Sequence, residues 1–275
     1  MAKERVDILL VKQGFYDSRE KAKRSIMAGE VYDKNGERLD KPGIKIDINE
    51  KLKVKSKIKK YVSRGGFKLE KALDVFNICL NNKIVLDIGA STGGFTDVAL
   101  QKNAQLVYAL DVGYNQLDWK IRNDKRVIVM EHKNFRYSKL SDFIYGQPEF
   151  AMTDVSFISL HLILPVLSHI LKPGNKAVML VKPQFEAGPQ NVGKNGIVRD
   201  PKVHLMVLND IIRFSLEIGY NVLGLDFSPI KGGKGNIEFL LYLQLINSNE
   251  KSYISPQINI NDVIKHAYLN LNKGW

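Results

Sequence analysis

The chain has 275 residues, 44% of them hydrophobic and 25% charged, which is typical of a globular protein and excludes wholesale disorder. Its single cysteine excludes an internal disulfide framework and a cysteine-based zinc site, and no run approaches the ~20 apolar residues of a membrane span. The N-terminal residues do not form a signal-peptide pattern, so we expect a cytoplasmic protein of two domains.

Positive charge is concentrated near the N-terminus. Residues 1–60 hold 17 basic and 10 acidic side chains, which gives +7 of the total formal charge of +12. A basic module of this kind favours a polyanionic partner, most often nucleic acid, because lysine and arginine neutralise phosphates and release counterions. A solvated surface that keeps the protein soluble is the alternative.

Residues 1–58 predict a small α+β domain. Apolar residues at helical spacing predict one helix over 4–13 and a second up to about residue 28. Short strands are predicted on both sides of a turn at residues 35–36 and over 51–60, where apolar and basic residues alternate. Residues 59–63 are predicted to be a linker. We expect four basic side chains to crowd the helical face: Arg5, Arg19, Lys21 and Arg24.

Residues 64–275 alternate between strand and helix patterns. After a helix over 67–76, buried-strand patterns recur; the strands are 83–89, 106–112, 126–130, 150–155 and 176–182. Helices are predicted from about residue 93, after residue 155 to about residue 170, and over 200–218. Such alternation predicts an α/β fold with a Rossmann-like, mainly parallel sheet. The last two strands, 220–228 and 236–246, can pair as an antiparallel hairpin. We expect Cys79 to be a small buried hydrophobe.

A glycine-rich loop follows the first of these strands, in VLDIGASTGGF (85–95). Its glycines allow sharp turns and the close approach of a ligand to the backbone. Asp111 ends the next strand, where an acid can accept hydrogen bonds from ribose hydroxyls. The layout suits S-adenosylmethionine or a dinucleotide, and a purely structural turn is the alternative. Ser91 stands where a dinucleotide fingerprint requires glycine, and Asp87 suits a ligand with an ammonium group, so we favour S-adenosylmethionine.

Charged residues mark the ends of later strands. Asp154 and Lys182 follow two apolar strands, and the carboxyl ends of strands form the ligand crevice of a doubly wound sheet. Glu238 lies in an apolar strand, where a lone acid needs a partner. Lys68 lies in the first helix of this domain. Two cations and two anions can neutralise one another in one cleft, although each alone could be a surface charge or a structural ion pair.

These residues suit methyl transfer to a hydroxyl group. Positioning of the nucleophile supplies much of the rate, and Lys182 could accept the hydroxyl proton or stabilise the developing alkoxide. Asp154 would orient Lys182, while Lys68 and Glu238 would hold the ribose and the network. Phe185 could belong to a substrate loop or pack in the fold. No metal is needed, and the histidines show no ligand spacing.

The chain also contains a series of longer blocks, which are YVSRGGFKLEKAL (61–73), VLDIGASTGGFTD (85–97), ALDVGYNQL (109–117), TDVSFISL (153–160), LVKPQFEAG (180–188) and GNIEFL (235–240). Together they resemble the TlyA (hemolysin A) family of S-adenosylmethionine-dependent ribosomal RNA ribose methyltransferases, whose catalytic domain is similar to FtsJ. Residues 5–43 resemble the α-L RNA-binding domain.

The resemblance implies 2′-O-methylation of cytidine in ribosomal RNA. It implies a catalytic tetrad of Lys68, Asp154, Lys182 and Glu238. With the ammonium argument for Asp87 added, the predicted cofactor contacts are Asp87, Gly89, Ala90, Ser91, Gly93, Gly94, Asp111 and Asn134. The predicted RNA-binding residues are Arg5, Arg19, Lys21, Arg24 and Arg64. The target nucleotide is expected to flip into the site.

Three rival functions stay open on the sequence. A non-catalytic ribosome assembly factor with a cofactor fold would bind RNA without turnover. A membrane-active hemolysin is suggested by the family name, but the chain offers only one modest amphipathic helix near 259–270. An NAD oxidoreductase would also need a hydride-relay histidine, which the sequence does not provide.

Overall fold

The computed structural model describes residues 3–16, 18–27, 29–54 and 60–271, and the chain divides into two compact units, Met1–Lys60 and Tyr61–Trp275. The linker predicted over 59–63 overlaps this boundary. Residue 59 lies outside the described residues, whereas Tyr61 is only 3% exposed and packs in the core of the second unit. The boundary therefore falls after residue 60, because the Tyr61 ring is buried by the second unit.

The first unit combines two helices with two small antiparallel sheets. Helix α1 (Val6–Lys12) and helix α2 (Arg19–Met27) confirm the predicted helices. Strand β1 (Lys3–Arg5) pairs with β3 (Lys45–Asp47), and β2 (Val31–Tyr32) pairs with β4 (Lys53–Val54). The sequence did not predict β1 or β3, because three-residue strands are too short to show alternation. The shared core is Val6, Leu9, Leu10, Ala22, Ile26, Val31 and Leu52.

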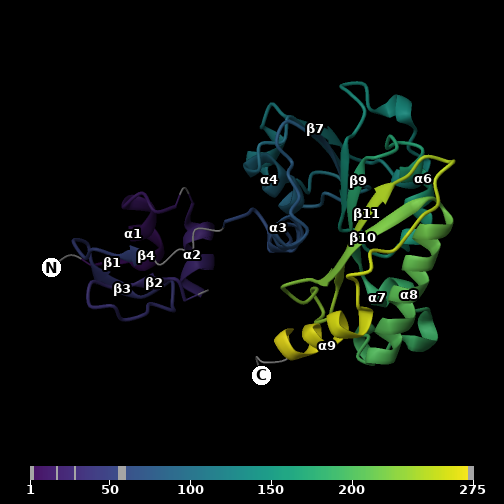
Figure 1. Ribbon diagram of the computed structural model, residues 1–275. Helices are drawn as coiled ribbons and strands as arrows, with labels where there is room; N and C mark the ends of the chain where they lie inside the picture. The colour runs from purple at the N-terminus through teal and green to yellow at the C-terminus, as the bar shows by residue number, and fades with distance from the viewer. Residues whose placement is uncertain (1–2, 17, 28, 55–59, 272–275) are drawn as a thin grey trace. The chain divides into compact units, whose positions relative to one another are not determined.

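The second unit is built on a seven-stranded sheet in the order β10-β11-β9-β8-β5-β6-β7 (Figure 1). The five strands from β9 to β7 are parallel, while β11 is antiparallel to both β9 and β10. This confirms the predicted mainly parallel sheet with its C-terminal hairpin. The strands are β5 (Ile84–Ile88), β6 (Leu106–Leu110), β7 (Val127–Met130), β8 (Phe150–Thr153), β9 (Lys176–Val181), β10 (Tyr220–Phe227) and β11 (Phe239–Leu245).

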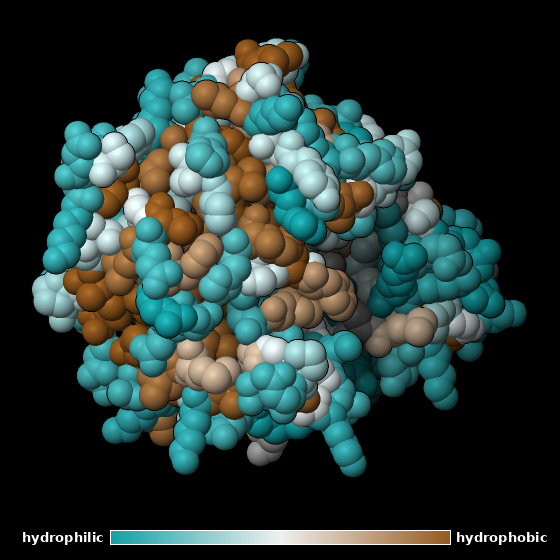
Figure 2. Space-filling model, turned by 90° about the vertical axis from the view of Figure 1, so that its right-hand side faces the viewer, coloured by the Kyte–Doolittle hydropathy of each residue, from teal (hydrophilic) through white to brown (hydrophobic). Residues whose placement is uncertain are grey.

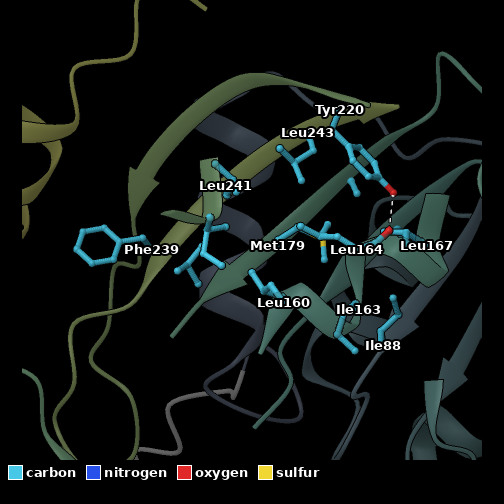
Figure 3. Packing of buried hydrophobic residues seen from close by; sticks show 14 of the residues in the cluster. Ile88, Leu160, Ile163, Leu164, Leu167, Met179, Tyr220, Phe239, Leu241 and Leu243 are labelled. Atoms are coloured by element: carbon cyan, nitrogen blue, oxygen red, sulfur yellow. Dashed lines mark hydrogen bonds between the residues drawn. The ribbon is translucent and has the colours of Figure 1, made fainter. Parts of the chain in front are cut away.

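Helices cover both faces of the sheet because alternate strand residues point to opposite sides. Val85 packs on one side with α3 (Gly66–Val75), α4 (Gly94–Gln101) and α5 (Trp119–Arg122). Leu86 packs on the other side with α6 (Leu164–Ser168), α8 (Pro201–Glu217) and α9 (Ile260–Leu271). Figure 3 shows this second core, where the buried Tyr220 hydroxyl donates a hydrogen bond to the Leu164 carbonyl at 3.2 Å.

Two local expectations were wrong. The helix predicted after β8 is split into a 3-10 turn (Leu160–Leu162) and α6, because Pro165 is accommodated only in the first turn of a helix. Cys79 is exposed rather than buried. Within the described residues, no helix combines the length and the hydrophobicity that a membrane crossing needs. On the face shown in Figure 2, hydrophilic residues lie between the hydrophobic ones.

Gly66 should be required by the packing at the start of α3. A Cβ atom on Gly66 would lie 2.5 Å from the ring of Tyr61, whereas a Cβ on Gly233 would meet nothing within 4 Å. We therefore expect Gly66→Ala to lower the free energy of unfolding by about 1–3 kcal/mol, despite the better helix propensity of alanine. Gly233→Ala is the matched control. Urea unfolding of both variants measures this, and equal stability of the two would contradict the packing argument.

Candidate active site

The sheet brings the four predicted catalytic residues to one edge. Asp154 directly follows β8 and Lys182 directly follows β9, and these two strands are parallel neighbours. Glu238 directly precedes β11, where the antiparallel pairing of Phe239 with Val181 places it level with the end of β9. Lys68 comes from the first turn of α3. The carboxyl ends of parallel strands lie at the same end of the sheet, so the strand order explains why Lys68 and Glu238 meet although they are 170 positions apart in the sequence.

The four side chains form one continuous ion-paired chain. Lys182 Nζ lies 2.6 Å from Asp154 Oδ1, and Lys68 Nζ lies 3.0 Å from Asp154 Oδ2. Lys68 Nζ also lies 2.8 Å from Glu238 Oε2. The side chains of Lys68 and Lys182 are each 9% exposed and that of Glu238 is 3% exposed. Two buried cations therefore share one buried anion, Glu238, and one partly buried anion, Asp154, so no charge of the four is left uncompensated.

The carboxylates hold this network in its charged form. Burial disfavours the Lys68 ammonium, but Asp154 and Glu238 outweigh burial and raise the pKa of Lys68 above its ordinary value. Burial likewise disfavours the Asp154 carboxylate, but Lys68 and Lys182 outweigh it and lower the pKa of Asp154. At neutral pH, Asp154 is thus an anion that accepts from both lysines and fixes their position.

A cavity of about 670 Å³, which we call the lysine cavity, opens onto this network. Its volume falls in the range of small-molecule and cofactor sites. Ser156, which sequence analysis did not single out, accepts a hydrogen bond from Lys182 Nζ at 2.9 Å and also lines the cavity. Arg64 is exposed on the same wall. The remaining lining includes the network residues, part of the 89–94 loop, and residues 184–185 and 230–236.

A second cavity of about 870 Å³, the loop cavity, adjoins the first. Asp111 and Asn134 line it together with residues of the 89–94 loop, as expected of cofactor contacts. Apolar side chains complete its walls, among them Ile88, Leu110, Phe135, Leu162 and Ile163. The two cavities share a wall made of Gly89, Ser91, Asp154, Ser156, Phe157 and Phe185. A ligand in either cavity therefore lies next to the ion-paired network.

Asp111 joins the loop to the end of β6. Its carboxylate accepts hydrogen bonds from the backbone N–H of Ser91 at 2.8 Å and of Gly113 at 2.7 Å. Asn134 accepts from the backbone N–H of Arg136 at 3.1 Å and so caps the turn after β7. Both side chains are thus held in place at the wall of the loop cavity, where carboxylate and amide oxygens can accept further hydrogen bonds.

The loop glycines serve packing as well as ligand access. Gly89, Ala90, Ser91 and Gly94 line one or both cavities, but Gly93 lies behind these walls. A Cβ on Gly94 would lie 2.2 Å from Ser63 Oγ, and a Cβ on Gly93, whose φ is +90°, would lie 2.8 Å from the Leu117 side chain. Gly93 is therefore required by packing as well, and a cofactor contact for it stays a prediction.

Asp87 lies beneath the loop, is fully buried, and lines neither cavity. Thr96 Oγ1 donates a hydrogen bond to its Oδ2 at 2.6 Å, while its Oδ1 has no hydrogen-bond partner among the described residues. Burial, reinforced by the charge of Asp154, raises the pKa of Asp87 to about 7. A cofactor contact for Asp87 stays a prediction.

In the first unit, two of the predicted RNA-binding residues are engaged in ion pairs. Arg5 Nε and Arg19 Nη2 each lie 2.9 Å from a carboxylate oxygen of Asp7, whose side chain is fully buried. The hydrogen bonds from Arg5 and Arg19 lower the pKa of Asp7 to about 2. Lys21 and Arg24 are exposed on α2. Arg19 therefore holds the start of α2 to α1, while Arg5, at the end of β1, pairs with Asp7 in the first turn of α1.

The raised pKa of Asp87 predicts a pH-dependent stability. The folded protein binds this proton more tightly than the unfolded chain does, so stability falls as pH rises from about 4 to about 7. Asp87→Asn lacks this proton site, so its unfolding free energy should not fall in the same way. The stability difference between Asp87→Asn and wild type should grow by about 1.4 kcal/mol per pH unit from about pH 4 to about pH 7 and stay constant at higher pH. Urea unfolding from pH 5 to pH 8 measures this, with the exposed Asp74→Asn as control. Parallel pH profiles of wild type and Asp87→Asn would refute the assignment.

Comparison with known proteins identifies the fold and the class of chemistry. Residues 61–245 match the FtsJ-like methyltransferase family. The chain is 58% identical over 271 residues to YqxC of Bacillus subtilis, which is named a suspected rRNA methyltransferase. The match spans 98% of this chain and 96% of YqxC. It is 40% identical over 246 residues to TlyA of Mycobacterium tuberculosis, named a 16S/23S rRNA (cytidine-2′-O)-methyltransferase, covering 87% of this chain and 89% of that one.

A solved structure agrees with these matches. A suspected hemolysin from Streptococcus thermophilus has a TM-score of 0.77 and 54% identity to this protein, covering 99% of this chain and 98% of that one. The family match confirms the predictions of a methyltransferase and of S-adenosylmethionine as its cofactor. It also excludes the alternative function of an NAD oxidoreductase. The chain belongs to the FtsJ-like methyltransferase family.

Proposed function

We propose that this protein transfers a methyl group from S-adenosylmethionine to the 2′-oxygen of a cytidine in ribosomal RNA, in the cytoplasm. The observation that carries this proposal is the position of Lys182. Its ammonium is fixed by Asp154 and Ser156 in the lysine cavity, beside the wall shared with the loop cavity. The named activity of the Mycobacterium tuberculosis relative supports the choice of ribose and base.

The loop cavity has the chemistry that S-adenosylmethionine requires. Asp111 offers carboxylate oxygens for ribose hydroxyls, and apolar side chains such as Ile88 and Phe135 can pack against an adenine ring. The Oδ1 of Asp87 has no hydrogen-bond partner among the described residues, but Asp87 lines neither cavity, so it would accept from the ammonium group of the methionine part only if the loop above it moves aside. When bound, S-adenosylmethionine supplies an electrophilic methyl group on a sulfonium.

Lys182 then serves the attacking 2′-oxygen. As the ammonium paired with Asp154, it donates a hydrogen bond to the oxygen as negative charge develops, which lowers the barrier. It could take the hydroxyl proton instead only as a neutral amine, after giving up a proton of its own. Asp154 keeps Lys182 in place, while Lys68 and Glu238 anchor Asp154 from its other side. The in-line placement of nucleophile and methyl group is the larger contribution that the protein makes to the rate.

The first unit is proposed to bind the ribosomal RNA. Net positive charge is concentrated in residues 1–60, and Lys21 and Arg24 are exposed on α2. In the second unit, Arg64 is exposed at the lysine cavity, where it can contact a phosphate next to the target ribose. Contacts of this kind position the RNA without reading its sequence.

Lys182→Ala should abolish methylation while cofactor binding survives. Removing the group that serves the 2′-oxygen is expected to slow single-turnover methyl transfer by at least about 100-fold. Because Lys182 borders the cavity of the RNA ribose, the affinity for S-adenosylmethionine should change little. Lys176→Ala, at the opposite end of β9, is the matched control and should retain activity. A Lys182→Ala variant with wild-type turnover would remove Lys182 from the chemistry.

Arg24→Ala should weaken RNA binding through charge alone. Loss of one phosphate contact makes the negative slope of log K against log salt shallower by about 1, without changing the affinity for S-adenosylmethionine. Lys251→Ala removes the same charge from an exposed site in the second unit and serves as control. Binding of ribosomal RNA at several salt concentrations measures both. Equal slopes for wild type and Arg24→Ala would show that Arg24 contacts no phosphate.

A further inference from the structure

Gln184 carries a buried carbonyl oxygen that the network described above does not use. It lies two residues after Lys182, in the short helix α7 (Pro183–Glu186). Its Oε1 atom is buried and has no hydrogen-bond partner among the described residues. A buried carbonyl without a donor is costly, and such groups in native proteins commonly belong to binding or catalytic sites.

Gln184 lies where the lysine cavity meets a smaller one. This side cavity has a volume of about 460 Å³ and shares Gln184, Phe185 and Gly196 with the lysine cavity. Its other walls are small or apolar, and they are Gly188, Pro189, Val192 and Gly193. A cavity with small and apolar lining residues and one amide, where it meets the lysine cavity, fits a flat ring that has a polar edge.

An aromatic pair borders the same place. The rings of Phe185 and Phe157 lie 5.0 Å apart between centroids, and Phe157 is 88% exposed. Aromatic side chains of this kind stack on unpaired nucleobases. The Phe157 ring lies at the surface, on the wall between the two main cavities.

The distance from the catalytic lysine suits a nucleotide. Lys182 Nζ lies 6.0 Å from the centroid of the Phe185 ring. In a nucleotide, the 2′-oxygen and the base are attached to adjacent carbons of one ribose. When Lys182 contacts the 2′-oxygen, the base can therefore reach the ring of Phe185, which also lines the side cavity.

We propose that Gln184 is a specificity-determining residue that hydrogen bonds the Watson–Crick edge of the target base where the lysine cavity meets the side cavity. The inference rests on the proposed function. Oε1 accepts from the 4-amino group of cytosine, and Nε2 donates to N3 of the same ring. Uracil carries an acceptor, O4, in place of the 4-amino group and a donor, N3–H, in place of the N3 acceptor. It can therefore pair with Gln184 only if the side-chain amide rotates by about 180°.

The test compares two RNAs that differ only at the methylated nucleotide. Once the target is mapped, the RNA is made by ligation with either cytidine or an abasic ribose at that position; both keep the 2′-hydroxyl. Single-turnover methylation is measured for wild type, for Gln184→Met, which keeps the side-chain length, and for Gln184→Ala. Gln190→Met, on an exposed residue of the following turn that lines none of these cavities, is the control.

We expect wild type and Gln190→Met to prefer the cytidine RNA. Both Gln184 variants should lose roughly 10-fold of this preference, chiefly by slower methylation of the cytidine RNA, and should methylate the abasic RNA at the wild-type rate. Their affinity for S-adenosylmethionine should be unchanged.

Three results would overturn the inference while leaving the proposed function intact. In the first, wild type methylates the two RNAs at equal rates. In the second, the Gln184 variants slow methylation of both RNAs equally. In the third, both variants lose cofactor binding. The last two would assign Gln184 to the architecture of the site. A wild-type protein that methylates neither RNA, although it binds S-adenosylmethionine, would instead contradict the proposed function.

Discussion

The bridging of two lysines by the carboxylate of Asp154 is the interaction on which the site depends. Asp154 contacts Lys182 through one oxygen and Lys68 through the other, and Glu238 balances the second lysine. Without this anion, two ammonium groups would face each other in a largely buried setting, where like charges repel strongly. The ion pairs therefore hold the catalytic lysine in place, and the strand order of the sheet makes them possible.

The shared wall of the two main cavities turns this geometry into a reaction site. Methyl transfer in one step requires donor and acceptor in contact, with the reacting atoms in line. The loop cavity and the lysine cavity meet at Asp154 and Ser156, so a cofactor in the first and a ribose in the second would meet beside Lys182. Gln184 and the side cavity extend the same site toward the base.

The sequence was sufficient to predict the fold and to single out three of the four charged residues, because these depend on local pattern. Lys68 has no comparable local signal, and the catalytic role of the set is what the resemblance to the TlyA family implies. Apolar runs locate the strands, and Asp154 and Lys182 stand at strand ends, where parallel topology gathers polar groups. Glu238 is recognisable as a lone acid in an apolar strand. The antiparallel hairpin was predictable from two adjacent strand patterns and a glycine-rich turn.

Features that depend on tertiary contacts could not be predicted. Gly93 and Gly94 read as ligand-binding glycines, but Leu117 and Ser63 leave no room for a Cβ at either position. The hydrogen bond between Ser156 and Lys182 has no sequence signal, and neither does the Gln184 oxygen that finds no partner in the described part of the chain, because both arise from side-chain geometry around the cavity. The ion pairs of the buried Asp7 with Arg5 and Arg19, two of the arginines predicted to bind RNA, likewise have no sequence signal.

Identification of the methylated nucleoside tests the central claim most directly. Unmodified small and large ribosomal subunits would be incubated with the purified protein and isotopically labelled S-adenosylmethionine, and the RNA digested and analysed by mass spectrometry. The account predicts that the label appears in 2′-O-methylcytidine, with the methyl group on the ribose fragment. Label on the base fragment, or no label in either subunit despite measurable cofactor binding, would contradict it.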